Sequence, residues 1–188
     1  MNERELIQKC KENDYSAQLT VYKSYKDMMY NVSIRIVKIR DEAEDIVQES
    51  FIKGFEKIGQ LKEDMSLGAW LKRIVINASL DHVRKQKKRI WIDEEKVFVK
   101  EEAEEIEIDE PEMITADRIK ECINSLKEKY RIILVLYLIE DYNHREISEL
   151  LQLKESTVRN QYKRGKDELM LMIDKIKKDE VKRIHTGS

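Results

Sequence analysis

Apolar residues recur at steps of three or four along both halves of the chain, and this period limits the fold more than any other feature. In the first long run they are Leu19, Tyr22, Tyr25, Met29, Val32 and Ile36. Such steps place side chains on one face of an α-helix, which turns once in about 3.6 residues. The chain has only 5 Gly and 1 Pro, too few for the turns of an all-β fold. The sequence therefore predicts an all-α protein.

Two further helices are predicted in the first half. The apolar face of the first is predicted to hold Ile46, Ile52, Phe55 and Ile58, with Phe51 beside it. Asp41 precedes this run as a candidate N-cap, and Gly59 is expected to close it. The second helix is expected to start near Ser66, to run through Val83 and to end in the basic residues 84–89. Together these helices predict a small N-terminal helical bundle.

An acidic stretch without a sustained period separates the two halves. Between Asp93 and Glu112 eleven acidic residues face two lysines, a local charge of −9 that leaves +7 on the rest of a chain whose net charge is −2. The stretch contains the only proline, Pro111, and is predicted to be a weakly structured linker. The predicted division is an N-terminal domain at residues 1–92, the linker at residues 93–113 and a C-terminal domain at residues 114–188.

Four helical segments are predicted beyond the linker. They cover residues 115–125 with Thr115 as N-cap, about 128–139, 145–151, and 155 to about 177. The third is short and is joined to the fourth by three residues, which is the spacing of a helix-turn-helix motif. We therefore expect a four-helix C-terminal domain that contains a DNA-binding motif.

The second helix of this motif carries a polar face suited to DNA. With Val158 and Tyr162 turned inward, helical periodicity sends outward Glu155, Ser156, Arg159, Asn160 and Lys163. Arg159 suits bidentate hydrogen bonds to a guanine edge. The basic residues that suit phosphate contacts are Lys163, Arg164 and Lys166. The alternative is a charged helical hairpin whose basic face meets only solvent.

Two patterns in the first half indicate further contacts. Four polar residues of the helix near Ser66 share one face at steps of four, four and three, namely Arg73, Asn77, Asp81 and Arg84. Such a face can hold single-stranded nucleic acid, and the alternative is a salt-bridge ladder beside a buried Trp70. The acidic run of residues 41–49, which ends beside an expected exposed Phe51, either docks on a partner helix or only faces water.

These three segments, in this order, resemble the extracytoplasmic-function (ECF) sigma factors, a branch of the bacterial sigma-70-type family. The likeness runs from about Leu19 to Leu169, apart from the linker. The first motif is Glu42-Ala43-Glu44-Asp45-Ile46-Val47-Gln48-Glu49-Ser50-Phe51. The second motif is carried by Trp70-Leu71, Ile74, Asn77, Asp81 and Arg84-Lys85. The third is carried by Tyr142, Glu146-Ile147, Leu151, Leu153 and Thr157-Val158-Arg159.

The resemblance implies a sigma factor that binds core RNA polymerase and reads two promoter elements. The residues implied for the clamp helices of the largest polymerase subunit are Asp45, Gln48, Glu49 and Phe51. Those implied for the melted −10 element, together with the stretch of residues 59–67, are Trp70, Arg73, Asn77, Asp81, Arg84 and Lys85. Those implied for the duplex −35 element are Ser156, Thr157, Arg159, Asn160, Lys163 and Arg164. The resemblance also implies that the linker threads into the polymerase's product channel, and that an anti-sigma factor is a partner.

Several positions depart from the family pattern, among them Lys127, which stands where proline often follows leucine. Gln152 stands where a turn glycine is usual, so backbone strain or a different turn is expected. Lys154 replaces the common serine N-cap of the recognition helix, so Glu155 or Ser156 is expected to serve instead. Leu67-Gly68 replaces the usual Phe-Arg at the start of the −10-binding helix.

Two other functions fit parts of the pattern: a conventional helix-turn-helix regulator that does not replace sigma, and a helical adaptor that binds no DNA. Catalysis is not expected, and no metal or cofactor is predicted, because the three histidines lack metal-ligand spacing and no glycine-rich phosphate loop occurs. No apolar run approaches the roughly 20 residues that span a bilayer, and no signal-peptide pattern opens the chain. The protein is therefore expected in the cytoplasm, at the nucleoid when active.

Overall fold

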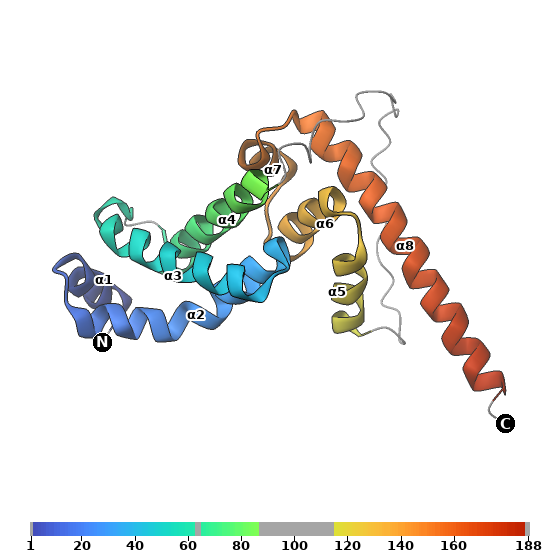
Figure 1. Cartoon of the computed structure of the whole chain (residues 1–188), viewed down its shortest axis with the longest axis horizontal. Helices are drawn as coiled ribbons and strands as arrows, with labels where there is room; N and C mark the ends of the chain where they lie inside the picture. Colours follow the sequence, from blue (N-terminus) through green and yellow to red (C-terminus); the bar gives the residue numbers. More distant parts are fainter. Residues whose placement is uncertain (1, 63–64, 87–114, 187–188) are drawn as a thin grey trace. The chain divides into compact units, whose positions relative to one another are not determined.

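The computed structural model describes residues 2–62, 65–86 and 115–186, with side chains as far as residue 178 (Figure 1). Within these ranges the chain is helical and no strand occurs, which confirms the predicted all-α class. The helices are α1 (Glu3–Lys11), α2 (Tyr15–Val37), α3 (Arg40–Glu56), η1 (Ile58–Gln60), α4 (Leu67–Gln86), α5 (Ala116–Ser125), α6 (Glu128–Leu134), η2 (Val135–Ile139), α7 (His144–Leu151) and α8 (Glu155–Thr186). Of these, α1 has no counterpart in the sequence prediction.

The described residues form two compact units, one within residues 1–88 and one within residues 89–188. This is the two-domain helical architecture that the periodicity predicts. The predicted linker at residues 93–113, the boundary at residue 92 and the end of the basic run at Arg89 lie outside the described residues. The detailed domain boundaries therefore stay predictions.

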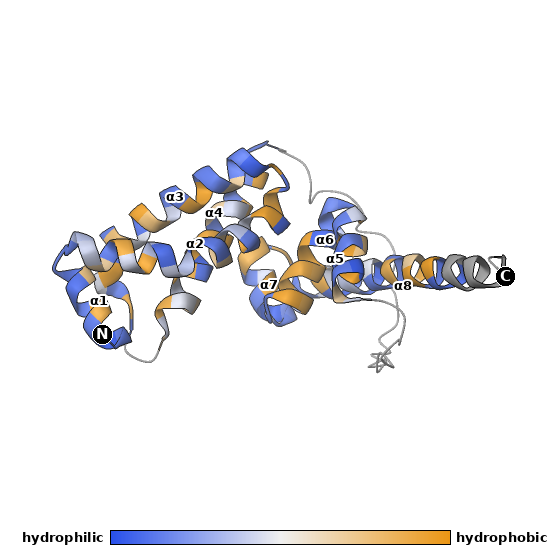
Figure 2. Cartoon of the chain, turned by 90° about the horizontal axis from the view of Figure 1, so that it is seen from below, coloured by the Kyte–Doolittle hydropathy of each residue, from blue (hydrophilic) through white to orange (hydrophobic). Residues whose placement is uncertain are grey.

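In the first unit α2, α3 and α4 pack against one another in pairs, and α1 packs against α2 and η1. Both apolar and polar residues are distributed along each of these helices (Figure 2). The largest fully buried side chains of this unit are Met29, Ile36, Leu67, Leu71, Ile76 and Leu80. Where α2 and α4 meet, the buried hydroxyl of Ser79 donates to that of Ser33 at 3.0 Å. This pairing satisfies polar atoms that would otherwise destabilise the core.

The third helix starts and ends earlier than predicted. Lys38 adopts left-handed backbone with φ 70° and ends α2, and the carbonyl of Ile39 then accepts the N–H of Ala43 at 2.9 Å. Asp41 is therefore not the N-cap but lies in the first turn of α3, where its charge still favours the helix dipole. Gly59 belongs to η1 and does not close α3. Both predicted boundaries are wrong by a few residues.

In the second unit α5, α6 and α7 each pack against α8. The predicted cap of α5 is confirmed, because Oγ1 of Thr115 accepts the N–H of Arg118 at 3.3 Å. The predicted helix at 128–139 is α6 continued by η2, a wider π turn. The buried core cluster consists of Cys122, Ile123, Leu126, Tyr130, Leu134, Val135, Leu169 and Ile173. α8 is longer than predicted, since it continues past residue 177.

A charged side chain lies in the middle of this apolar unit. Arg131, in α6, is only 2% exposed. Burial lowers the pKa of its guanidinium group, and the carboxylate of Glu128 acts in the opposite direction. Because a buried cation needs nearby anionic or hydrogen-bonding groups, Glu128 helps α6 to tolerate an arginine at this position.

Candidate functional site

The predicted polymerase-binding face lies along α3. Asp45, Gln48 and Glu49 are exposed there, as the acidic run predicts. Lys53 donates from Nζ to Oε2 of Glu49 at 3.2 Å, one turn further along the helix. Gln48 also lines a cleft between α2 and α3, whose other walls include Tyr30. The face therefore offers carboxylate and amide groups beside a recess.

The prediction that Phe51 is an exposed aromatic on this face is wrong. The side chain is 3% exposed. Its ring meets the ring of Tyr22 edge-on with 5.0 Å between centroids, and the ring of Phe55 at 6.0 Å. The inner side of α3 also holds Val47 and Gly54, four residues before and three after Phe51. Phe51 therefore supports α3 from the core and is not placed to meet a partner.

Ile52 occupies the outer position instead. It is 60% exposed, so the prediction that it belongs to the buried apolar face is also wrong. Ile52 lies seven residues after Asp45 and four after Gln48, and these steps put the three side chains on one side of the helix. The seven-residue step is the sequence signal for this position. An exposed isoleucine surrounded by polar groups suits the apolar centre of a docking surface.

The predicted nucleic-acid face of α4 is exposed. Its exposed members are Arg73, Asn77, Asp81 and Lys85. Arg84 is partly buried and donates from Nη1 to Oδ1 of Asp81 at 2.7 Å, so two of the predicted DNA contacts hold each other in the free chain. Trp70 is partly buried against α3, where a Cβ on Gly54 would lie 3.7 Å from its ring. Trp70 therefore contributes to packing as well as to this face.

The polar contacts at the two ends of α4 were not predicted. At the first end, the N–H of Leu67 donates to Oε1 of Glu3 at 3.0 Å. At the other end, Glu42 of α3 accepts from Nε2 of Gln86 at 2.6 Å and pairs with Nε2 of His82 at 2.9 Å. The hydrogen-bonded partners are 64 and 44 positions apart in sequence. Helical periodicity reports only near neighbours, so no pattern in the sequence points to these contacts.

The structure explains why Gly68 replaces the arginine of the family pattern. A Cβ at this position would lie 2.8 Å from Cε1 of Tyr25, so the tyrosine ring occupies the space of a side chain. An arginine at position 68 would have to displace that ring. Gly68 and Tyr25 therefore fit each other in this chain.

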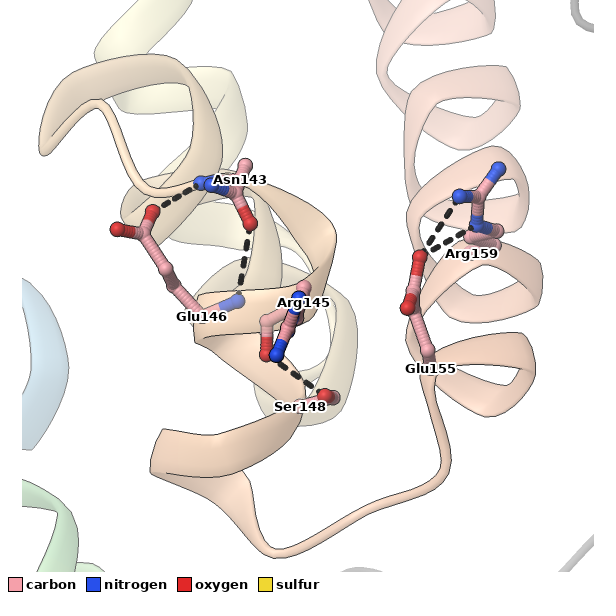
Figure 3. A network of polar contacts seen from close by, with 6 residues as sticks. All are labelled: Asn143, Arg145, Glu146, Ser148, Glu155 and Arg159. Carbon is pink, nitrogen blue, oxygen red and sulfur yellow. Dashed lines mark hydrogen bonds and ion pairs between the residues drawn. The ribbon is translucent and has the colours of Figure 1, made fainter.

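The predicted helix-turn-helix is formed by α7 and α8. Asn143 and Glu146 make a capping box, in which Oδ1 of Asn143 accepts the N–H of Glu146 at 3.0 Å and the carboxylate of Glu146 accepts the N–H of Asn143 at 2.9 Å (Figure 3). After α7, Gln152 adopts left-handed backbone with φ 55° and ψ 40°. The N–H of Leu153 then donates to the carbonyl of Ser148 at 3.0 Å. The turn thus has the geometry that glycine favours, and the strain expected at Gln152 is confirmed.

The expectation that Glu155 or Ser156 is the N-cap of α8 is wrong. The carbonyl of Lys154 accepts the N–H groups of Thr157 at 3.0 Å and of Val158 at 3.2 Å, so Lys154 holds the cap position. The left-handed residue Gln152 reverses the chain after α7, and α8 begins only three residues later, at Glu155. A lysine side chain cannot accept a hydrogen bond, so this cap lacks the side-chain acceptor that serine would give.

The first turns of α8 present the predicted polar residues outward. Val158 is fully buried and Tyr162 partly buried, as predicted. The exposed residues are Ser156, Arg159, Asn160 and Lys163, and the partly buried ones are Glu155, Thr157 and Arg164. Oε1 of Glu155 accepts from Nε of Arg159 at 3.1 Å and from Nη2 at 2.7 Å (Figure 3). The guanidinium of Arg159 is therefore oriented by Glu155 before any DNA is present.

An aromatic cluster holds α7 against α8 behind this face. The ring of His144 stacks on Tyr137 at 4.6 Å and meets Tyr162 edge-on at 5.0 Å. Burial lowers the pKa of His144, the nearby charge of Arg159 lowers it further, and the carboxylate of Glu155 partly opposes both effects. The histidine is therefore favoured in its neutral form within the folded unit.

We expect the second unit to lose stability as the pH falls below about 6.5, the pKa of a histidine in the unfolded chain. Because the pKa of His144 is lower in the folded than in the unfolded chain, the unfolded chain takes up the proton first. The contribution that neutral His144 makes to stability is complete above the unfolded pKa of about 6.5. It is lost as the pH falls from this value through the lower pKa of the folded unit. Thermal unfolding at several pH values measures the loss. His144→Phe keeps an aromatic ring but binds no proton, so its stability should depend less on pH. If this variant lost as much stability on acidification as the unmodified chain, the assignment to His144 would be wrong.

Other kinds of site are not found in the described part of the chain. No group of three or more His, Cys, Asp or Glu side chains within it is placed to hold a metal ion. None of its helices combines the length and the apolar character needed to cross a membrane. Cys10 and Cys122 are both buried and free.

Comparison with known proteins matches each unit to a separate family model. The model of sigma-70 region 2 matches residues 21–89, and that of sigma-70 region 4 matches residues 116–169. The chain is 29% identical over 173 residues to the ECF RNA polymerase sigma factor SigW of Bacillus subtilis (strain 168), covering 87% of this chain and 92% of the relative. The first match spans α2 to α4, and the second spans α5 to the middle of α8.

Two solved structures have a similar fold. One is the sigma factor RpoE in complex with the anti-sigma factor NepR from Bartonella quintana, with a TM-score of 0.52 and 21% identity over 79% of this chain and 91% of that chain. The other is CnrH in complex with the cytosolic domain of CnrY, with a TM-score of 0.53 and 16% identity over 92% of this chain and 97% of that chain.

Proposed function

The chain belongs to the ECF branch of the sigma-70 family, and from this premise we propose that it binds core RNA polymerase and directs initiation at specific promoters. One observation carries the proposal. The chain joins a unit that has an exposed polar face on α4 to a second unit that contains a helix-turn-helix, and each unit matches its own sigma region. A regulator that only reads duplex DNA could use the first unit for dimerisation or sensing, but it would need no nucleic-acid face on α4.

The exposed side of α3 is proposed to bind the clamp helices of the largest polymerase subunit. Asp45, Gln48 and Glu49 supply hydrogen-bonding groups, and Ile52 supplies apolar area at the same side. Phe51 contributes indirectly, because its buried ring fixes α3 against Tyr22. A polar rim around an apolar contact is the usual composition of a specific protein interface.

The exposed side of α4 is proposed to hold the melted −10 element. Arg73 and Lys85 supply cations for phosphates, and Asn77 supplies donors and acceptors for a base. Asp81 and Arg84 pair with each other in the free chain, and this pair would open to meet DNA. Trp70 presents the part of its ring that does not pack against α3.

The first two turns of α8 are proposed to read the −35 element in the major groove. Arg159, oriented by Glu155, is placed to meet a guanine edge, with Ser156, Thr157 and Asn160 beside it. Lys163 and Arg164 follow one turn later, where a recognition helix leaves the bases and meets phosphates. The DNA contacts of this helix thus divide into base reading near its start and positioning further along.

The energy of strand opening explains why this chain needs the polymerase. Separating stacked base pairs costs about 1.4 kcal/mol per step, so several open steps exceed what one small helix face can offset. The proposed role therefore combines capture of the opened strand by α4 with the contacts of the core enzyme. Sigma factors do not catalyse a reaction themselves, and this chain is proposed to act in the same way, in the cytoplasm. An anti-sigma factor is proposed as a regulatory partner, because the similar sigma factor RpoE is found in complex with the anti-sigma factor NepR.

Promoter binding by the free chain and by the reconstituted holoenzyme tests this proposal. We expect feeble binding by the chain alone and tight binding by holoenzyme that weakens steeply with salt, because phosphate contacts release counterions. Electrophoretic shift of a labelled promoter at two salt concentrations distinguishes the two. Tight duplex binding by the chain alone, unchanged by core enzyme, would favour a conventional helix-turn-helix regulator.

A further inference from the structure

A carboxylate from α1 holds the start of α4. The backbone N–H of Leu67 donates to Oε1 of Glu3 at 3.0 Å. The first N–H groups of a helix have no partner within that helix. A carboxylate is a strong acceptor for them, since the bond is charge-assisted and the N-terminal end of the helix dipole is positive. Glu3 therefore caps a helix to which it does not belong.

Further contacts fix the same point of the chain. The ring of Tyr25, in α2, lies against Gly68, where a Cβ would come within 2.8 Å of Cε1. Burial raises the pKa of the Tyr25 hydroxyl, and the charge of Glu3 raises it further. Oγ of Ser66 accepts the N–H of Ala69 at 3.3 Å. The start of α4 is thus held by α1, by α2 and by its own preceding residue.

Helix α1 also contacts η1, the element that precedes α4 in the chain. α1 packs against η1 as well as against α2, with Cys10 fully buried. Ile58 of η1 and the following Leu61 are buried too. The elements on both sides of the short connection from η1 to α4 therefore contact α1. This connection leads into the helix that is proposed to hold the −10 strand.

We propose that α1 is a strap that positions the start of α4 for capture of the melted −10 strand, with Glu3 as the positioning residue. The inference rests on the proposed function. α1 precedes residue 21, where the match to sigma-70 region 2 begins, so the strap lies outside the matched part of the chain. Without the Glu3 contact, one of the restraints on the start of α4 would be lost, so part of its ordering would have to occur when DNA binds. The free energy spent on that ordering would weaken strand capture.

Open-complex formation by the full-length chain with core polymerase tests the strap. Glu3→Ala removes the acceptor, whereas Glu3→Gln keeps an amide oxygen that can accept the Leu67 N–H. Glu12→Ala is a matched control, because it removes the same charge from the C-cap of α1, where the exposed Glu12 accepts from Nε2 of Gln8 at 2.8 Å. Permanganate reactivity of thymines in the −10 element measures opening, and a separate titration measures affinity for the core enzyme.

We expect Glu3→Ala to lower open-complex formation roughly tenfold while its affinity for core polymerase stays within twofold of the unmodified chain. Glu3→Gln should restore most of the opening, and Glu12→Ala should match the unmodified chain. If Glu3→Ala and Glu12→Ala opened the promoter equally well, the proposed role of α1 would be overturned. It would also be overturned if Glu3→Ala lost as much affinity for core polymerase as it lost opening, because that would indicate a general structural defect. If the unmodified chain itself failed to open any promoter, the proposed function would fall instead.

Discussion

Asp45→Ala combined with Gln48→Ala is expected to weaken binding to core polymerase roughly a hundredfold without unfolding the chain. A polar side chain that contributes to an interface costs on the order of 1 kcal/mol or more when it is truncated, and about 1.4 kcal/mol for each of the two gives that factor. Both side chains are exposed, so the core of the first unit does not depend on them. Titration of labelled core polymerase with each chain measures the dissociation constant, and thermal unfolding checks the fold.

A matched variant separates this effect from a change of composition or charge. Gln8→Ala with Glu12→Ala also removes one amide and one carboxylate, but from the exposed surface of α1. Its affinity for core polymerase is expected to stay within twofold of the unmodified chain. If both double variants lost affinity equally, or if neither did, the assignment of the polymerase-binding face to α3 would be wrong.

Arg159→Ala is expected to relax promoter choice at one base pair of the −35 element. A bidentate arginine contact to guanine discriminates by about 1–3 kcal/mol, which is about 5- to 150-fold. The two hydrogen bonds that Arg159 donates to Glu155 orient the guanidinium, so little side-chain freedom remains to be lost on binding. Initiation by holoenzyme from a library of −35 sequences measures the preference at every position.

Lys163→Ala gives the contrasting result that makes this prediction specific. Lys163 is exposed one turn beyond Arg159 and is proposed to meet phosphate. Its loss should weaken binding to all −35 sequences alike and reduce the slope of the salt dependence by about one. If Lys163→Ala changed sequence preference and Arg159→Ala weakened all promoters equally, the proposed orientation of α8 in the groove would be wrong.

The parts of the fold that depend on near neighbours were predictable. The period of Val158 and Tyr162 correctly orients the first turns of α8, because residues three and four apart share one helix face. Thr115 was recognised as a cap, since its side chain bonds to a backbone group only three residues away. The strain at Gln152 was expected from the family resemblance, because the pattern has a glycine at this position, and a different turn was the alternative.

Other features could not be predicted, because they depend on how a helix is rotated about its axis or on a residue far away in the sequence. The predicted exposures of Phe51 and Ile52 were the wrong way round. Adjacent helical residues point about 100° apart and both are apolar, so composition does not show which one faces the core. The contact from Glu3 to Leu67 joins residues that only the packing of α1 brings together. The burial of Arg131 could not be predicted, because a charged residue is expected at the surface. Only the packing of α6 among apolar helices buries it.

Run-off transcription with purified bacterial core polymerase shows whether this chain directs promoter-specific initiation. A pool of promoters with randomised −10 and −35 elements is transcribed with and without the chain, and the selected sequences are read. We expect initiation that depends on the chain, selects both elements, and is lost in Asp45→Ala/Gln48→Ala. Initiation that does not depend on the chain, or selection of a single duplex element by a chain that binds it without polymerase, would contradict the account.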